Sequence, residues 1–151
     1  MKSYSILVLN GPNINMLGIR EPEIYGEKTY ENLLDYIEEE CEKRELQVTF
    51  AQSNHEGDLV DRIQQAYGKI DGIVFNPAAY THTSVAILDA LKATMIPTVE
   101  VHISDVDERE EFRKISMISS VCIKTIKGHG FQGYIEALDY LKNYLEKENK
   151  Q

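Results

Sequence analysis

The stretch Ile6-Leu-Val-Leu-Asn10-Gly-Pro-Asn13 decides the fold of this chain, because an unbroken apolar run stops abruptly at a polar, turn-forming segment. Four consecutive apolar residues without polar alternation are typical of a strand buried on both faces of a parallel sheet. The segment that follows has no helical or strand periodicity, and three glycines and two prolines between positions 11 and 26 interrupt any regular element. A long irregular loop in a short domain is usually functional or disordered. We therefore predict that residues 10–26 form an active-site loop and lid.

Composition indicates one ordinary globular domain. The chain has 151 residues, of which 42% are hydrophobic and 27% charged, so we expect a single domain over residues 1–151 with a frayed, charged tail at 146–151. A net charge of −9 argues against nucleic acid or an anionic membrane as the partner, because either requires a basic face. No run approaches the ~18 apolar residues of a membrane span. Since Met1-Lys2-Ser3 leads directly into the first strand, we expect no signal peptide and a cytoplasmic location.

The two cysteines point to free thiols. Cys41 and Cys122 fall in a predicted helix and a predicted strand, and neither belongs to a group with metal-ligand spacing. Buried free thiols in a reducing compartment are the commoner outcome for such a pair, with a disulfide as the alternative. We expect no metal site.

Strands and helices are predicted to alternate along the chain. Apolar patterns predict strands at about 6–9, 46–51, 72–76, 97–102 and 121–126, and helices at about 29–44, 57–66, 84–93, 104–113 and from 133 onward. This alternation implies right-handed crossovers and a parallel sheet covered on both faces. We predict a flavodoxin-like, doubly wound α/β fold with five strands in the order 2-1-3-4-5.

Polar residues follow three of these strands where each strand ends. They are Asn10–Asn13 after the first strand, Asn76–His82 after the third and Glu100–Ser104 at the end of the fourth. Ligands of doubly wound sheets bind outside the carboxyl ends of the strands, near the switch between the first and third. We therefore expect these three segments to meet in one crevice.

Arg20 and Tyr25 form the first candidate catalytic pair. A tyrosine with a pKa of about 10 is a poor base at neutral pH, and a nearby guanidinium would lower that pKa. A loop flanked by glycines could close such a pair over a substrate and exclude water. From spacing alone, a surface arginine and a packed tyrosine remain the commoner outcome.

Glu100 and His102 form the second candidate pair. Residues two apart in a strand project from the same face, and a carboxylate beside an imidazole fixes its tautomer and supports its protonated form. That is what a general acid requires. A structural histidine at a strand end is an equally good interpretation of the spacing.

Other polar groups near the predicted crevice suit an anionic, hydroxylated ligand. The segment Asn76–Ser84 offers amide, hydroxyl and imidazole groups, although Thr83 or Ser84 also serves to cap the next helix. The backbone N–H groups of Ile103 and Ser104 precede a predicted helix, which favours a bound carboxylate. Arg109 and Arg113 lie one helical turn apart, where either ligand binding or a surface salt bridge is possible.

The sequence blocks together resemble the type II 3-dehydroquinases over essentially the whole chain. The blocks are Asn10-Gly-Pro-Asn13, Leu17-Gly18 with Arg20-Glu-Pro22 and Tyr25-Gly26, Asn76 through His82-Thr-Ser84, Glu100-Val-His-Ile-Ser104 with Arg109-Glu-Glu-Phe-Arg113, and Gly128-x-Gly-x-x-Gly-Tyr134. Any one block is weak evidence, whereas all of them in order and spacing are highly specific. Modest departures from the family pattern occur at Ile19, Asp105 and 119–125.

The resemblance implies dehydration of 3-dehydroquinate to 3-dehydroshikimate in the shikimate pathway by anti elimination through an enolate, without metal or organic cofactor. It also implies a homododecamer built as a tetramer of trimers. Carried onto this chain, the resemblance makes Tyr25 the proton acceptor. It makes Arg20 the group that lowers the pKa of Tyr25 and stabilises the transition state. Asn13 holds a water that stabilises the enolate. His102, supported by Glu100, becomes the proton donor. The implied substrate contacts are Asn76, Ile103 and Ser104 on the carboxylate, His82 and Arg113 on the ring hydroxyls, and Asp89 from a neighbouring subunit.

A non-catalytic flavodoxin-like module is the alternative, either flavin-binding or a phospho-receiver. A flavin site needs a hydroxyl- and glycine-rich phosphate loop after the first strand, where this chain has Asn-Gly-Pro-Asn. A receiver needs carboxylates where this chain has Asn10 and Asn76. The segment Gly128–Gly133 matches a dinucleotide-binding pattern literally, but it opens the last helix with no strand after it. We therefore interpret it as tight packing between strand and helix or as a subunit contact.

Overall fold

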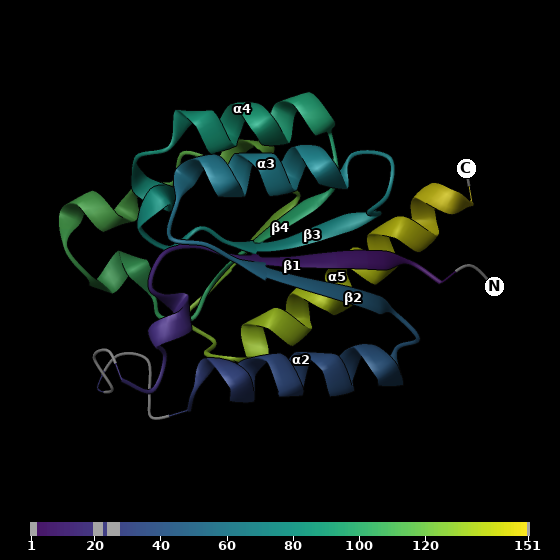
Figure 1. Cartoon of the computed structure of the whole chain (residues 1–151), viewed down its shortest axis with the longest axis horizontal. Helices are drawn as coiled ribbons and strands as arrows, with labels where there is room; N and C mark the ends of the chain where they lie inside the picture. Colours follow the sequence, from purple (N-terminus) through teal and green to yellow (C-terminus); the bar gives the residue numbers. More distant parts are fainter. Residues whose placement is uncertain (1–2, 20–22, 24–27, 151) are drawn as a thin grey trace.

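The sheet has the predicted topology. The computed structural model describes residues 3–19, 23 and 28–150, and within them five parallel strands form one sheet in the order β2-β1-β3-β4-β5 (Figure 1). The strands are β1 (Ser5–Asn10), β2 (Gln47–Gln52), β3 (Gly72–Asn76), β4 (Thr98–His102) and β5 (Lys124–Lys127). Arg20 and Tyr25 lie outside the described residues.

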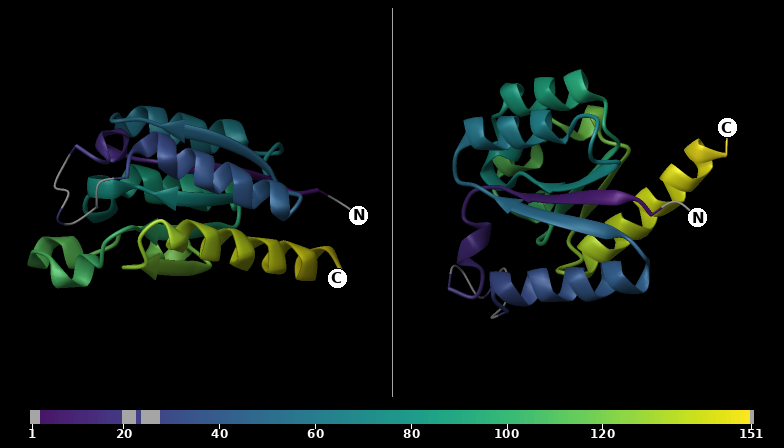
Figure 2. Two further views of the ribbon diagram at one scale, coloured as in Figure 1. Left: turned by 90° about the horizontal axis from the view of Figure 1, so that it is seen from below. Right: turned by 45° about the vertical axis from the view of Figure 1, so that its right-hand side comes forward.

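Two layers of helices cover the sheet (Figures 1 and 2). The helices α2 (Tyr30–Lys43) and α5 (Gln132–Asn149) pack on one face, and α3 (Glu56–Ala66) and α4 (Val85–Thr94) pack on the other. Right-handed crossovers from a twisted parallel sheet produce this arrangement. It leaves the carboxyl ends of the strands together at one edge of the molecule.

The apolar run of β1 lies at the centre of both cores. Ile6 and Val8 face the core beneath α2 and α5, whereas Leu7 and Leu9 face the core beneath α3 and α4. Asn10, the next residue, has no exposed surface, although it is polar. The unalternating pattern therefore did indicate a strand buried on both faces.

Local capping explains two helix starts. The Thr29 side chain accepts a hydrogen bond from the backbone N–H of Asn32, whose side chain accepts one from the N–H of Thr29, so that α2 begins with a complete capping box. The Ser84 hydroxyl accepts from the N–H of Ile87 and caps α4 in the same way. The sequence predicted that a helix begins at about position 29, and it offered Thr83 or Ser84 as the cap of the later one.

Two predictions about the second half of the chain were wrong. The expected helix at 104–113 is instead two 3-10 turns, Val106–Glu108 and Glu111–Lys114, because the backbone at Arg109 is extended. The expected strand at 121–126 begins only at Lys124, since Ser119–Val121 forms a turn and pairing with β4 starts at Val99. The last helix, α5, continues to Asn149 beyond its last core residue, Leu145.

The two cysteines are free thiols, as expected from the sequence. Cys41 is buried and Cys122 is half-buried. Burial raises the pKa of Cys41 to about 11. Among the described residues, no helix is both long enough and apolar enough to cross a membrane.

Candidate active site

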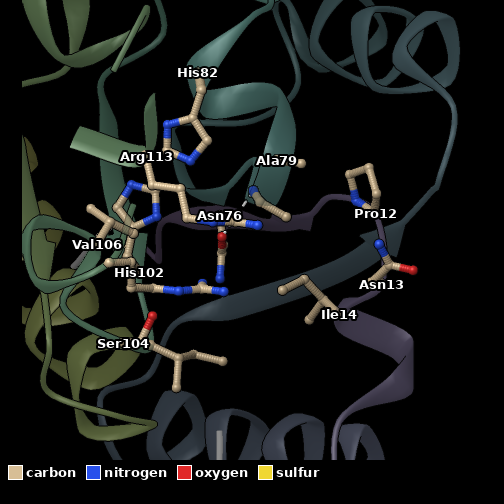
Figure 3. Close-up of a pocket in the computed structure, with 13 residues that line it drawn as sticks. Pro12, Asn13, Ile14, Asn76, Ala79, His82, His102, Ser104, Val106 and Arg113 are labelled. Carbon is tan, nitrogen blue, oxygen red and sulfur yellow. Dashed lines mark hydrogen bonds between the residues drawn. The ribbon is translucent and has the colours of Figure 1, made fainter. Parts of the chain in front are cut away.

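A pocket of about 210 Å3 opens at the carboxyl ends of β1, β3 and β4, where the sequence placed the crevice (Figure 3). Pro12, Asn13 and Ile14 form one wall, and His82, His102 and Ser104 lie on the opposite side, with Asn76 between the two (Figure 3). The remaining lining residues are Ala78, Ala79, Ile103, Val106, Arg109 and Arg113. Segments separated by up to a hundred residues in sequence therefore meet around one cavity.

The loops after β1 and β3 are joined by a backbone contact. The N–H of Gly11 donates to the carbonyl oxygen of Asn76 at 2.7 Å. A Cβ at Gly11 would lie 2.4 Å from the carbonyl oxygen of Pro77, so only glycine fits at this crossing. Two residues of the pocket wall, Asn13 at φ 69° and Ala78 at φ 54°, adopt the left-handed conformation. The wall thus holds conformations that an isolated chain disfavours, as functional loops often do.

Glu100 and His102 form a buried pair at the end of β4. The Nε2 atom of His102 lies 2.5 Å from Oε2 of Glu100. His102 is 5% exposed and Glu100 is completely buried. Burial by itself raises the pKa of Glu100, but the hydrogen bonds and the charge from His102, with further bonds from two serines, hold that pKa below its ordinary value. The ionised carboxylate accepts the Nε2 proton, which leaves Nδ1 as the nitrogen that can meet a substrate.

Three hydroxyl groups also donate to the Glu100 carboxylate. Ser119 donates at 2.8 Å, Ser116 at 2.9 Å and Thr125 at 3.3 Å. The Ser116 oxygen in turn accepts from the backbone N–H groups of Ile118 and Ser119, so its own hydrogen is directed to the carboxylate. These residues line a second cavity of about 260 Å3 behind His102. The carboxylate is therefore stabilised as an ion on the side away from the first pocket.

The tautomer of His82 follows from its backbone contact. Its Nδ1 lies 2.7 Å from the carbonyl oxygen of Ile115, and because a carbonyl only accepts, Nδ1 carries the proton. Burial lowers the pKa of His82 by more than this hydrogen bond raises it, and His102 and Arg113 lower it further. Neutral His82 therefore presents Nε2 as an acceptor for a hydroxyl group.

Two arginines supply local positive charge. Arg109 and Arg113 both line the pocket of this acidic protein. Arg113 is paired with Glu110 and stacks over the ring of Phe112, with its guanidinium carbon 5.2 Å from the ring centre. An anionic ligand would be attracted to this part of the cavity.

Residues suited to bind a metal do not cluster in the part of the chain that the structure describes. Within residues 3–19, 23 and 28–150, no group of three or more His, Cys, Asp or Glu side chains is arranged to hold an ion.

Comparison with known proteins identifies the family. The model of the Dehydroquinase class II family matches residues 4–142. The chain belongs to the class II dehydroquinase family. It is 56% identical to a 3-dehydroquinate dehydratase of Clostridium acetobutylicum over 94% of this chain and 99% of that protein. It is 53% identical to one of Fusobacterium nucleatum, over 94% of this chain and 99% of that protein.

Solved structures agree with the family. The crystal structure of type II dehydroquinase from Butyrivibrio crossotus superposes with a TM-score of 0.91 at 54% identity, over 93% of this chain and 98% of that chain. The crystal structure of type II dehydroquinase from Propionibacterium acnes superposes with a TM-score of 0.90 at 42% identity, over 93% of this chain and 97% of that chain. A 3-dehydroquinate dehydratase-like protein from Bifidobacterium longum is more distant, with a TM-score of 0.71 at 29% identity over 95% and 98%.

Most of the site residues predicted for a dehydroquinase lie together in the described structure. Seven of them line the first pocket, and they are Asn13, Asn76, His82, His102, Ile103, Ser104 and Arg113. Glu100 lies behind His102 and lines the second cavity. Asp89 does not line the pocket of its own chain, because it lies on the exposed side of α4. Arg20 and Tyr25 fall outside the described residues.

Some residues of this dehydroquinase site had no sequence signal. Ser116, Ser119 and Thr125 are spread over ten positions without periodicity, and only the fold brings their hydroxyls to Glu100. Arg109, which the sequence left undecided between a ligand and a surface ion pair, lies in the pocket lining.

Proposed function

We propose that this pocket dehydrates 3-dehydroquinate by anti elimination through an enolate, with His102 as the general acid. As a class II dehydroquinase, the chain is a 3-dehydroquinate dehydratase, a hydro-lyase that forms 3-dehydroshikimate in the shikimate pathway, toward chorismate and the aromatic amino acids. The observation that carries the mechanistic proposal is the buried Glu100–His102 pair, whose hydrogen bond fixes Nε2 and leaves Nδ1 free for the substrate.

The elimination needs a base, stabilisation of negative charge and an acid. A base removes the proton on the carbon beside the ketone, and the electron pair of that C–H bond forms the enolate. When the enolate collapses, the C–O bond to the hydroxyl breaks and Nδ1 of His102 gives its proton to the departing oxygen, which leaves as water. The Glu100 carboxylate stabilises the imidazolium before this transfer.

We assign the base and the oxyanion contacts from the family resemblance. Tyr25 takes the proton, Arg20 lowers the pKa of Tyr25 and stabilises the transition state, and Asn13 holds a water at the enolate oxygen. Asn13 lines the pocket, which supports its part.

We assign the substrate contacts from the family resemblance as well, and the lining of the pocket supports them. Asn76 and the backbone of Ile103 and Ser104 bind the carboxylate, and all three residues lie on the pocket wall at the ends of β3 and β4. His82 accepts a ring hydroxyl through Nε2, and Arg113 binds a second oxygen. Their donors and acceptors are complementary to an anion that carries hydroxyl groups.

The direct test is an absorbance assay of the conjugated enone product. Metal-stripped protein mixed with 3-dehydroquinate should show a rise in ultraviolet absorbance at catalytic protein concentration. His102→Ala should lower kcat by about 10²–10⁴, the usual contribution of a general acid. His129→Ala is the matched control, because His129 pairs with Glu136 away from the first pocket. Near-normal turnover by folded His102→Ala would refute the acid assignment, and near-normal turnover by Tyr25→Phe would refute the base.

We also propose the quaternary structure and location implied by the resemblance. The chain forms a cytoplasmic homododecamer, a tetramer of trimers, in which Asp89 reaches the substrate of a neighbouring subunit. The exposed position of Asp89 supports this arrangement. Co-refolding Asp89→Asn with His102→Ala should restore part of the activity that each variant lacks, because some mixed sites then hold both intact groups. Co-refolded variants no more active than the separate ones would place Asp89 outside any shared site.

A further inference from the structure

A glycine-rich turn behind the pocket has no role in the mechanism above. This turn, residues 128–133, runs from the end of β5 into the first two residues of α5, and Tyr134 follows it directly in that helix. The N–H of Gly128 donates to the carbonyl of His102 at 3.2 Å, and the N–H of Gly130 donates to the carbonyl of Ile103 at 3.0 Å. The turn therefore contacts the backbone that carries the proposed acid and the proposed carboxylate site.

Positive φ angles explain why glycine occupies two of these positions. Gly128 has φ +84° and Gly130 has φ +60°, a region that side chains with a Cβ rarely adopt. A Cβ at Gly128 would also lie 3.2 Å from Cβ of Asp105. The turn folds back tightly enough to begin α5 directly beneath the carboxyl end of the sheet (Figure 1).

Tyr134 is the first large side chain after this turn, and it is completely buried. Its hydroxyl donates to Oδ1 of Asn10 at 2.7 Å and accepts from Nδ2 of Asn76 at 3.1 Å. Burial raises the pKa of Tyr134, so the hydroxyl keeps its proton and its donor role at neutral pH. One hydroxyl thus links the ends of β1 and β3.

The orientation of the Asn76 amide is fixed by this contact and by one other. Its Oδ1 accepts from the N–H of Ala78 at 3.1 Å, and one hydrogen of Nδ2 goes to Tyr134. An amide has two N–H donors, so the second remains for a ligand in the pocket that Asn76 lines. Without the tyrosine hydroxyl, the amide would keep only the contact of its Oδ1 with the N–H of Ala78, and its orientation would be less firmly fixed.

We propose that Tyr134 is a positioning residue for substrate binding. Its hydroxyl orients the Asn76 amide so that one N–H points at the substrate carboxylate. The glycine-rich turn before α5 places the Tyr134 side chain beneath that amide. The inference rests on the proposed function of the pocket. Because the carboxylate does not react, the contact acts alike in the ground state and the transition state, and its loss raises KM more than it lowers kcat.

The test compares two buried tyrosines of the same core. Tyr134→Phe removes one oxygen and keeps the ring packing, and it should raise KM about tenfold while kcat stays within about threefold of wild type. Tyr4→Phe is the matched control, because the buried Tyr4 hydroxyl donates to the Leu145 carbonyl at 3.4 Å, at the amino end of β1. Tyr4→Phe should leave KM unchanged although it also loses a buried hydroxyl.

A double-mutant cycle separates positioning from general loss of stability. If Tyr134 acts through Asn76, adding Tyr134→Phe to Asn76→Ala should change KM by less than about twofold. Additive effects of the two substitutions, an unchanged KM in Tyr134→Phe, or an equal rise in Tyr4→Phe would each overturn the inference. Wild-type turnover of 3-dehydroquinate, measured in the same assay, tests the proposed function separately, since it does not depend on Tyr134.

Discussion

Gly11→Ala is the substitution whose effect the structure defines most sharply. The new methyl carbon would lie 2.4 Å from the carbonyl oxygen and 2.7 Å from the carbonyl carbon of Pro77. Both atoms belong to the backbone, so no side chain can rotate away. Restoring ordinary contact requires the loops after β1 and β3 to separate by about 1 Å.

The expected cost has two parts. Overpacking at a rigid site costs about 1–3 kcal/mol, and the same movement stretches the 2.7 Å hydrogen bond between Gly11 and Asn76, which costs about 1 kcal/mol more. We expect the free energy of unfolding to fall by about 2–4 kcal/mol. Because both loops form walls of the pocket, a displacement of about 1 Å should also lower kcat/KM about 100-fold.

Urea denaturation at one fixed protein concentration, followed by circular dichroism, measures the stability change, and the enone absorbance assay measures turnover. Gly57→Ala is the matched control, because nothing lies within 4 Å of a Cβ at Gly57 in α3. Alanine there should stabilise the protein by roughly 0.5–1 kcal/mol, since glycine is unfavourable within a helix. A Gly11→Ala variant with wild-type stability and turnover would show that the two loops can separate without any loss of unfolding free energy or activity, which would refute the prediction.

Three further predictions concern the pocket wall and the buried carboxylate. Ala78→Gly should raise the free energy of unfolding by about 1 kcal/mol, and with it the urea midpoint, because glycine adopts φ 54° without strain. An unchanged or lower midpoint would show that the Ala78 backbone is not strained. Glu100→Gln should lower kcat about 100-fold in the enone assay, since a neutral amide no longer stabilises the His102 imidazolium, and retained kcat would argue against that role. The pKa of Glu100 is held below its ordinary value of 4.5, so its ionised form stabilises the fold above pH 4.5 and that stability is lost as the pH falls through the folded pKa. Urea midpoints measured from pH 6 downward should therefore fall more steeply for wild type than for Glu100→Gln, and parallel curves would contradict the linkage.

Local sequence signals predicted the elements whose formation depends on neighbours in the chain. The apolar run of β1, the start of α2 near position 29 and the cap of α4, offered as Thr83 or Ser84, each depend on a few neighbouring residues. Each could therefore be inferred before the fold was seen. The alternation of strands and helices was then enough to predict the parallel sheet and its order. The two chain segments expected near the switch between β1 and β3 do meet there, through Gly11 and Asn76.

Contacts between distant segments decided the rest, because the chain carries no local signal for them. Val121, the predicted start of the last strand, instead ends a turn formed by Ser119–Val121, and the Ser119 hydroxyl donates to Glu100 on the neighbouring strand β4. Arg109 has an extended backbone that ends the expected fourth helix and leaves its side chain at the pocket.

The sequence by itself determined the family, the topology and the identity of most groups around the pocket, because these follow from local patterns and from motifs in order. The tertiary structure alone decided how those groups are held. The tautomer of His82, the hydroxyls on Glu100 and the link from Tyr134 to Asn76 each join residues more than 15 positions apart. Such hydrogen bonds form only when the sheet has brought its strand ends together, and burial then makes an unpaired partner costly.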